Sequence, residues 1–374
     1  MTVDSGGIAS IPLSPRNLPI ELQSQITAYL DHPSLIATSS ASWVLHLECE
    51  RYLYTNVKIS NERQIESFLY SLRQDPDRAK RVLSCMILDF DVHQHTLVHS
   101  MLKAMSKLRS LVILPNIPEM DFNAGWDALL TGCDFQLLEF VTSFDCDRAL
   151  TNFLITQTGI EKYIHSGYTP TQNTNIFHDP SVLPSLKHFH GNIIDLSIII
   201  PHRPVTHVTV QDGIAAMGLQ YVLHPLGSSK GPIEHLSLSF VDPVTSASLS
   251  LIQQHTPRLQ TLELAAPSAR SARSELDWAE GLASFKHLTR LSYEKTATSL
   301  AGEVRPLSPA FQKELVAAWS EACPSLRTVE FTVEVVQDAD DTIDEILRDV
   351  ECWTLDTKQR WTYGKVERAA GQAW

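Results

Sequence analysis

A short apolar phrase, L-x-x-L-x-L, returns along this chain and constrains its fold more than any other feature. Clear copies begin at Ile233, Leu259 and Leu326. The last two apolar positions of the phrase are two residues apart, so both side chains point to the same side of a short strand. The first apolar position comes three residues earlier and anchors the turn that leads into the strand. The phrase therefore predicts structural repeats, each built on one short strand.

Further copies appear when the chain is aligned on the second apolar position of the phrase. The aligned residues are Met86, Leu111, Phe140, Tyr163, Phe189, Val208, Leu236, Leu262, Leu291 and Val329. Most steps between them fall in or near the range of roughly 20–29 residues that leucine-rich repeats show. Helical patterns lie between the phrases at 248–255, 277–286 and 309–322. We expect an irregular α/β solenoid of leucine-rich-repeat type, with a parallel sheet on one side and helices on the other.

A separate helical block is expected before the first repeat. Pro19 suits the first position of a helix, and the apolar residues that follow at helical spacing are Leu18, Leu22, Ile26, Tyr29 and Leu30. The run 31–33 ends that helix, a second one holds Leu35, a third begins near Ser42, and 54–59 forms the first strand. The predicted domains are a flexible N-terminus at 1–11, a helical domain at 12–55 and a repeat solenoid at 56–374.

The helical block resembles an F-box in the run Leu18-Pro19-x-Glu21-Leu22-x-x-x-Ile26-x-x-Tyr29-Leu30, followed by Leu35 and Ser42-Trp43. The next segment, 51–59, is similar to the one that follows the F-box in many fungal F-box proteins with degenerate leucine-rich repeats. In that family the F-box docks on a Skp-type adaptor of a cullin–RING ubiquitin ligase, and the repeats select a target protein. The resemblance implies that the adaptor-binding residues are Leu18, Pro19, Leu22, Ile26, Leu30 and Leu35.

The predicted function is therefore that of a substrate-recognition subunit of an SCF-type ubiquitin ligase, with no catalytic residue and no cofactor. From the residues alone, a second interpretation is open. The chain is then a ligase-independent leucine-rich-repeat scaffold whose helical block only caps the first repeat.

Sequence motifs of catalytic or metal-binding sites are absent or incomplete in this chain. The chain has no G-x-S-x-G, no P-loop and no G-x-G-x-x-G. His95-x-x-x-His99 has the spacing at which two imidazoles share one helix face, as in some metal sites, and His188-x-His190 is a weaker pair. No complete ligand set accompanies either pair, so we predict no metal site.

Composition narrows the class of partner. The formal charge of −13 over 374 residues argues against a general nucleic-acid binder. Acidic residues concentrate between Glu330 and Glu351, which we interpret as a solvated face of the last helix, or else as a patch for a basic partner.

No apolar run approaches the roughly 20 residues that span a bilayer, and the N-terminus does not have the pattern of a secretory signal. The six scattered cysteines suit a reducing compartment, so we expect a cytoplasmic or nuclear protein.

Overall fold

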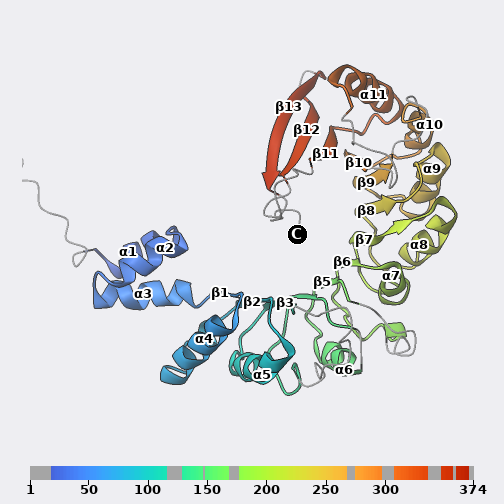
Figure 1. The fold of residues 1–374 in the computed structure, drawn as a ribbon. Coiled ribbons are helices and arrows are strands. Elements are labelled where there is room, and N and C mark those ends of the chain that lie inside the picture. Colours follow the sequence, from blue (N-terminus) through green and yellow to red (C-terminus); the bar gives the residue numbers. More distant parts are fainter. Residues whose placement is uncertain are drawn as a thin grey trace, which may run out of the picture.

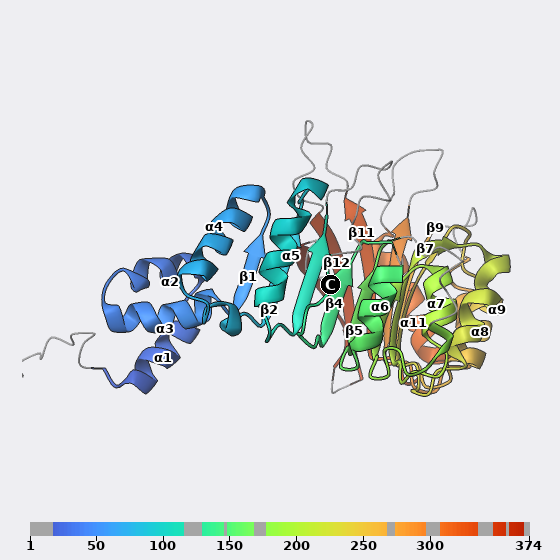
Figure 2. The same ribbon diagram turned by 90° about the horizontal axis from the view of Figure 1, so that it is seen from below.

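A computed structural model describes residues 18–115, 129–145, 148–167, 177–267, 274–296, 307–335, 347–356 and 359–369. These residues form one curved sheet of 13 strands that lines the inside of an arc, and helices cover its outer side (Figure 1). Seen from below, a block of three helices extends beyond the first repeat at the N-terminal end (Figure 2). The molecule is an α/β protein with a solenoid-like repeat fold.

The strands are β1 (Asn56–Ile59), β2 (Ser84–Leu88), β3 (Ser110–Leu114), β4 (Glu139–Thr142), β5 (Lys162–His165), β6 (His188–Gly191), β7 (His207–Ile214), β8 (His235–Phe240), β9 (Thr261–Pro267), β10 (Arg290–Thr296), β11 (Thr328–Val335), β12 (Leu347–Leu355) and β13 (Trp361–Ala369). The helices are α1 (Ile20–Ala28), α2 (His32–Ser39), α3 (Trp43–Leu53), α4 (Glu62–Gln74), α5 (His95–Ala104), α6 (Arg148–Thr156), α7 (Ile193–Ile199), α8 (Leu219–Leu226), α9 (Ser246–His255), α10 (Trp278–Leu282) and α11 (Pro309–Ala322). The strands follow one another across the sheet in sequence order, and β1 to β11 are parallel.

One apolar row crosses all the parallel strands and is buried beneath the helices from β2 onward. Its members are Val57, Cys85, Leu111, Phe140, Tyr163, Phe189, Val208, Leu236, Leu262, Leu291 and Val329. The sequence alignment predicted this register from the third repeat onward but was wrong at Met86. Cys85 occupies the row instead, because Cys85 and Ile87 are both buried while Met86 between them points to the other side of the strand.

A backbone carbonyl at the entry of each strand joins neighbouring repeats. The Leu83 carbonyl accepts hydrogen bonds from the N–H groups of Arg109 and Ser110, at 2.8 and 3.0 Å. Each repeat from Thr55 to Thr289 contains the same arrangement, with two successive amides on one carbonyl. These bonds hold the strands in register, and a slip of one residue would turn the apolar row toward solvent.

The C-terminal segment corrects the expectation of a last acidic helix. Residues 328–335 form β11, and β12 and β13 then add an antiparallel extension to the sheet. Glu330 is buried and forms an ion pair with Arg290 at 2.7 Å, and Glu351 accepts a hydrogen bond from the Tyr363 hydroxyl at 2.9 Å. Apolar and polar residues alternate with period two in β11, which is a strand pattern. Most of the acidic residues lie at 336–346, outside the described residues.

Arg203 fastens a connecting loop in the middle repeats. Its side chain is buried, and its guanidinium donates hydrogen bonds of 2.5–3.0 Å to the carbonyl oxygens of Phe177, Asp179, Val182 and Ile199. Burial lowers the pKa of Arg203 to about 10, which leaves the group charged at neutral pH. Four carbonyl oxygens, three from the loop at 177–182 and one from the end of α7, therefore converge on one cation.

Replacing Arg203 is expected to destabilise the repeats. Arg203→Ala leaves buried carbonyls without their donor, so we expect the free energy of unfolding to fall by about 3 kcal/mol or more. Arg258→Ala, at an exposed arginine, is the matched control and should change it by less than about 0.5 kcal/mol. Urea unfolding followed by circular dichroism measures both, and equal effects of the two substitutions would contradict this role of Arg203.

Candidate functional site

The helical block contains the three helices that the sequence predicts. Asp31 caps α2 by accepting a hydrogen bond from the Ser34 amide, and Ser42 caps α3 by accepting one from the Leu45 amide. Each cap satisfies a backbone N–H that the first turn of a helix leaves without a partner. Residues 12–17 of the predicted domain lie outside the described residues.

The packing of α1 against α3 is polar. Gln23 and Thr27 are the buried residues of α1. The Ser24 hydroxyl donates a hydrogen bond of 2.5 Å to Glu48, and the Tyr52 hydroxyl donates one of 3.1 Å to the Ser24 carbonyl. Two hydrogen bonds thus join α1 to α3.

The apolar side chains of the block lie on its surface instead. Tyr29 is 90% exposed, Trp43 72% and Ile26 50%. The exposed large apolar residues of the block are Ile20, Leu22, Ile26, Tyr29, Ile36, Trp43, Val44 and Leu47. We call this set the apolar face. Exposed apolar side chains gathered at one end of a molecule are typical of a protein-binding surface.

The six predicted adaptor-binding residues divide into surface and interior positions. Pro19, Leu22 and Ile26 are exposed, and Leu18 and Leu30 are half-buried. In contrast, Leu35 is 6% exposed and lies in the interior of the block. Its side chain is thus not open to a partner in this structure. No observation tests adaptor binding by these residues, which therefore stays a prediction.

Ion pairs fasten the block to the first repeat. The Glu50 carboxylate, buried at the end of α3, bonds to the guanidinium of Arg78 and lies 3.4 Å from that of Arg81. Arg78 also stands over the ring of Tyr54, with its guanidinium carbon 5.2 Å from the ring centroid. These contacts hold the apolar face in a defined orientation relative to the repeats.

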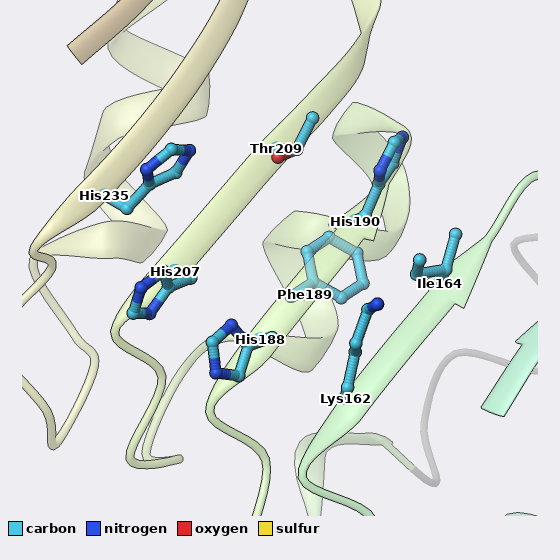
Figure 3. A pocket seen from close by; sticks show the side chains of 8 residues that line it. All are labelled: Lys162, Ile164, His188, Phe189, His190, His207, Thr209 and His235. Carbon is cyan, nitrogen blue, oxygen red and sulfur yellow. The ribbon is translucent and has the colours of Figure 1, made fainter. Parts of the chain in front are cut away.

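A second candidate surface is a shallow hollow of about 140 Å³ on the inner face of the sheet (Figure 3). Its eight lining residues come from β5 to β8. They are Lys162, Ile164, His188, Phe189, His190, His207, Thr209 and His235. We call it the histidine hollow.

Three of its histidines form a row across neighbouring strands. His188, His207 and His235 occupy the same register position on β6, β7 and β8. The ring centroids of His188 and His207 are 4.1 Å apart, and those of His207 and His235 are 5.5 Å apart. Each histidine directly precedes a member of the buried apolar row, so the alternation of the strand turns it to the open face.

The imidazoles of the hollow are less basic than usual. Burial lowers the pKa of His188, His207 and His235, and it lowers the pKa of His190 to about 4. The hollow is therefore uncharged at its histidines near neutral pH. Lys162 supplies its one ammonium group, which is 2.7 Å from the Glu139 carboxylate.

Sequence reasoning missed His207 and His235 as site residues. The signal was present in the repeat alignment, since both residues come directly before an aligned apolar position, as His188 does. The predicted pair His95 and His99 lies on α5, where the His99 ring donates a hydrogen bond to the Leu129 carbonyl at 2.9 Å. Over the described ranges, no group of three or more His, Cys, Asp or Glu residues is arranged to hold a metal ion.

Comparison with known proteins leaves the family unassigned. No family model and no curated protein matches the chain. A chain in the crystal structure of the yeast Rad7 and Elc1 complex is similar at 13% sequence identity, with a TM-score of 0.47, over 87% of this chain and 91% of that one. Within the described part of the chain, no helix is both long and apolar enough to cross a bilayer.

The exposure of the apolar face predicts how its residues respond to substitution. Tyr29→Ser and Trp43→Ser should each change the free energy of unfolding by less than about 0.5 kcal/mol, because neither side chain is buried. Leu35→Ala removes a buried side chain and should cost about 2 kcal/mol or more. Urea unfolding of the three variants measures this, and a large loss at Tyr29 would show that the face packs inside the protein.

Proposed function

We propose that this protein is a substrate-recognition subunit of a cullin–RING ubiquitin ligase. The helical block docks on a Skp-type adaptor, and the inner face of the repeats holds a target protein. The observation that carries the proposal is the polarity of α1, which buries Gln23 and Thr27 and exposes Leu22 and Ile26, with Tyr29 exposed directly after the helix. A helix that turns apolar side chains outward is suited to a helix-in-groove association with a partner.

The same observation favours docking over the scaffold interpretation. A helical block that only caps a solenoid needs a polar outer surface to stay soluble. Here the block exposes eight large apolar side chains, and its ion pairs with the repeats join Glu50 to Arg78 and Arg81 of the first repeat. Capping accounts for the ion pairs and leaves the apolar face without a role.

In this function the protein contributes position and no chemical step. The adaptor fixes one end of the molecule, and the curved sheet presents the bound target to the ubiquitin-charged enzyme of the ligase. The target and the ubiquitin-charged enzyme are then held close together in a fixed orientation and need not meet by diffusion, which is the contribution of a positioning subunit. The proposal places the protein in the cytoplasm or nucleus, where such ligases act.

Aspartate substitutions on the apolar face test the docking step. Leu22→Asp and Ile26→Asp each place a charge where apolar contact is proposed, so the affinity for a purified Skp-type adaptor should fall at least about 30-fold. Met217→Asp is the matched control, because Met217 is an equally apolar residue, 88% exposed on the repeats. Pull-down and calorimetric titration of the full chain measure the effect.

Circular dichroism of the same variants checks that the repeats stay folded. Unchanged adaptor binding by both α1 variants would overturn the proposal. The scaffold interpretation makes the opposite forecast: the unaltered protein binds no adaptor, and deletion of 12–50 destabilises the repeats.

A further inference from the structure

The histidine hollow has a composition unlike the rest of the chain. The protein carries a formal charge of −13, yet none of the eight residues that line the hollow has a carboxylate. Four imidazoles, one ammonium group and the Thr209 hydroxyl provide its polar side-chain atoms, and Ile164 adds an apolar side chain beside them (Figure 3). A neutral imidazole has one N–H donor and gains a second when protonated.

The charged groups around the hollow are paired with one another. Lys162 pairs with Glu139, Lys187 with Glu161 at 2.9 Å, and Arg290 with Glu330 at 2.7 Å. On the β8 side, His235 lies 3.7 Å from Glu263, and Glu234 acts on His207 through its charge. Two of these carboxylates, those of Glu234 and Glu263, thus act on histidines of the hollow from outside it. The lining residues themselves present imidazole N–H groups, an ammonium group and no carboxylate.

We propose that the histidine hollow binds anionic side chains of an extended peptide segment, the aspartates, glutamates or phosphorylated residues of a partner protein. That this partner protein is the target of a ligase rests on the function proposed above. The binding of an anionic segment in the hollow does not depend on that function. The donors of the hollow, the absence of a carboxylate among its lining residues and the alignment of its rings across three strands carry this inference.

The dimensions of the row fit such a segment. Neighbouring strands are about 4.8 Å apart, so three aligned histidines extend over about 10 Å. Side chains on one face of an extended peptide are about 7 Å apart. A peptide that crosses the strands therefore sets two anionic side chains within reach of the row.

Binding of an anion is coupled to protonation of the row. Burial and the neighbouring cations Lys162 and Arg290 hold the imidazole pKa values down in the free protein. An anion in the hollow favours the charged imidazole and raises those pKa values, so the complex takes up protons. Affinity then increases as the pH falls, which a purely apolar or cation-binding site would not show.

Labelled peptides test the site directly on the full chain. One neutral Gly/Ser framework carries two glutamates, two phosphoserines or two glutamines at alternate positions, and fluorescence anisotropy measures binding at pH 7.5 and 6.0. We expect at least one anionic peptide to bind ten-fold or more tighter than the glutamine peptide. The glutamate peptide, whose own charge is nearly constant over this range, should gain three-fold or more at pH 6.0. The tighter of the two anionic peptides decides between acidic and phosphorylated segments.

Substitutions locate the binding within the hollow. His207→Gln removes the central ring of the row and His188→Gln an outer one, and each should weaken binding at least five-fold and flatten its pH dependence. His287→Gln, at an exposed histidine outside the hollow, is the control and should change neither. Thermal unfolding shows that each variant is folded.

Three outcomes would overturn the proposal. They are equal binding of anionic and neutral peptides, unchanged binding by both hollow variants, and tighter binding of a single-stranded oligonucleotide than of every peptide. The adaptor pull-down of the same hollow variants keeps the two proposals separate. A variant that loses peptide binding but still binds the adaptor affects only the proposal for the histidine hollow. A variant that loses adaptor binding but still binds the peptide affects only the proposal for the apolar face.

Discussion

The parallel register of the apolar row is the constraint on which the rest of the structure depends. Each strand aligns its second apolar position with that of its neighbour, as Phe189, Val208 and Leu236 do, and the paired amides on one carbonyl hold that alignment. Because side chains alternate along a strand, this single register decides which residues the helices cover and which remain on the inner face. The histidine row is a direct consequence of it.

The helices cover only one side of the sheet. Most parallel sheets are covered on both faces and carry apolar side chains on each. In this protein the inner face stays open and carries mixed polar residues. Even the covered side includes a polar contact, since the buried ring of His165 lies 2.5 Å from the Asp195 carboxylate through Nδ1 and donates to the Phe144 carbonyl through Nε2. The middle repeats, which hold the hollow, thus include a buried polar pair within the core.

The helical block packs differently from the repeats. Hydrogen bonds and ion pairs around Ser24 and Glu50 hold it together, and most of its large apolar residues are exposed. Burying polar groups costs free energy unless they are paired, and these contacts supply the pairing. A partner that covers the apolar face would add the hydrophobic stabilisation that the isolated block lacks, and would bind more tightly for doing so.

Periodicity was enough to predict the local structure. The spacing of the phrase indicated the alternation of strand and helix, the capping and proline signals placed the three N-terminal helices, and the row register followed from the alignment, with an error of one residue at Met86. These features are local in sequence, so propensity and pattern determine them. The antiparallel extension formed by β12 and β13 was not predicted, because the acidic run that ends at Glu351 was interpreted as the solvated face of a helix.

What the sequence by itself determined is thus the type of fold and the position of the helical block. Only the tertiary structure decided which way each apolar stripe faces: Leu22 and Ile26 are turned outward and Leu35 inward, although all three fit one apolar pattern. It likewise brought His188, His207 and His235 together from positions 19 and 28 residues apart in the chain. The physical reason is the same in both cases. A residue's periodicity shows that it belongs to a face, but the packing of other elements against that face decides whether it is core or surface.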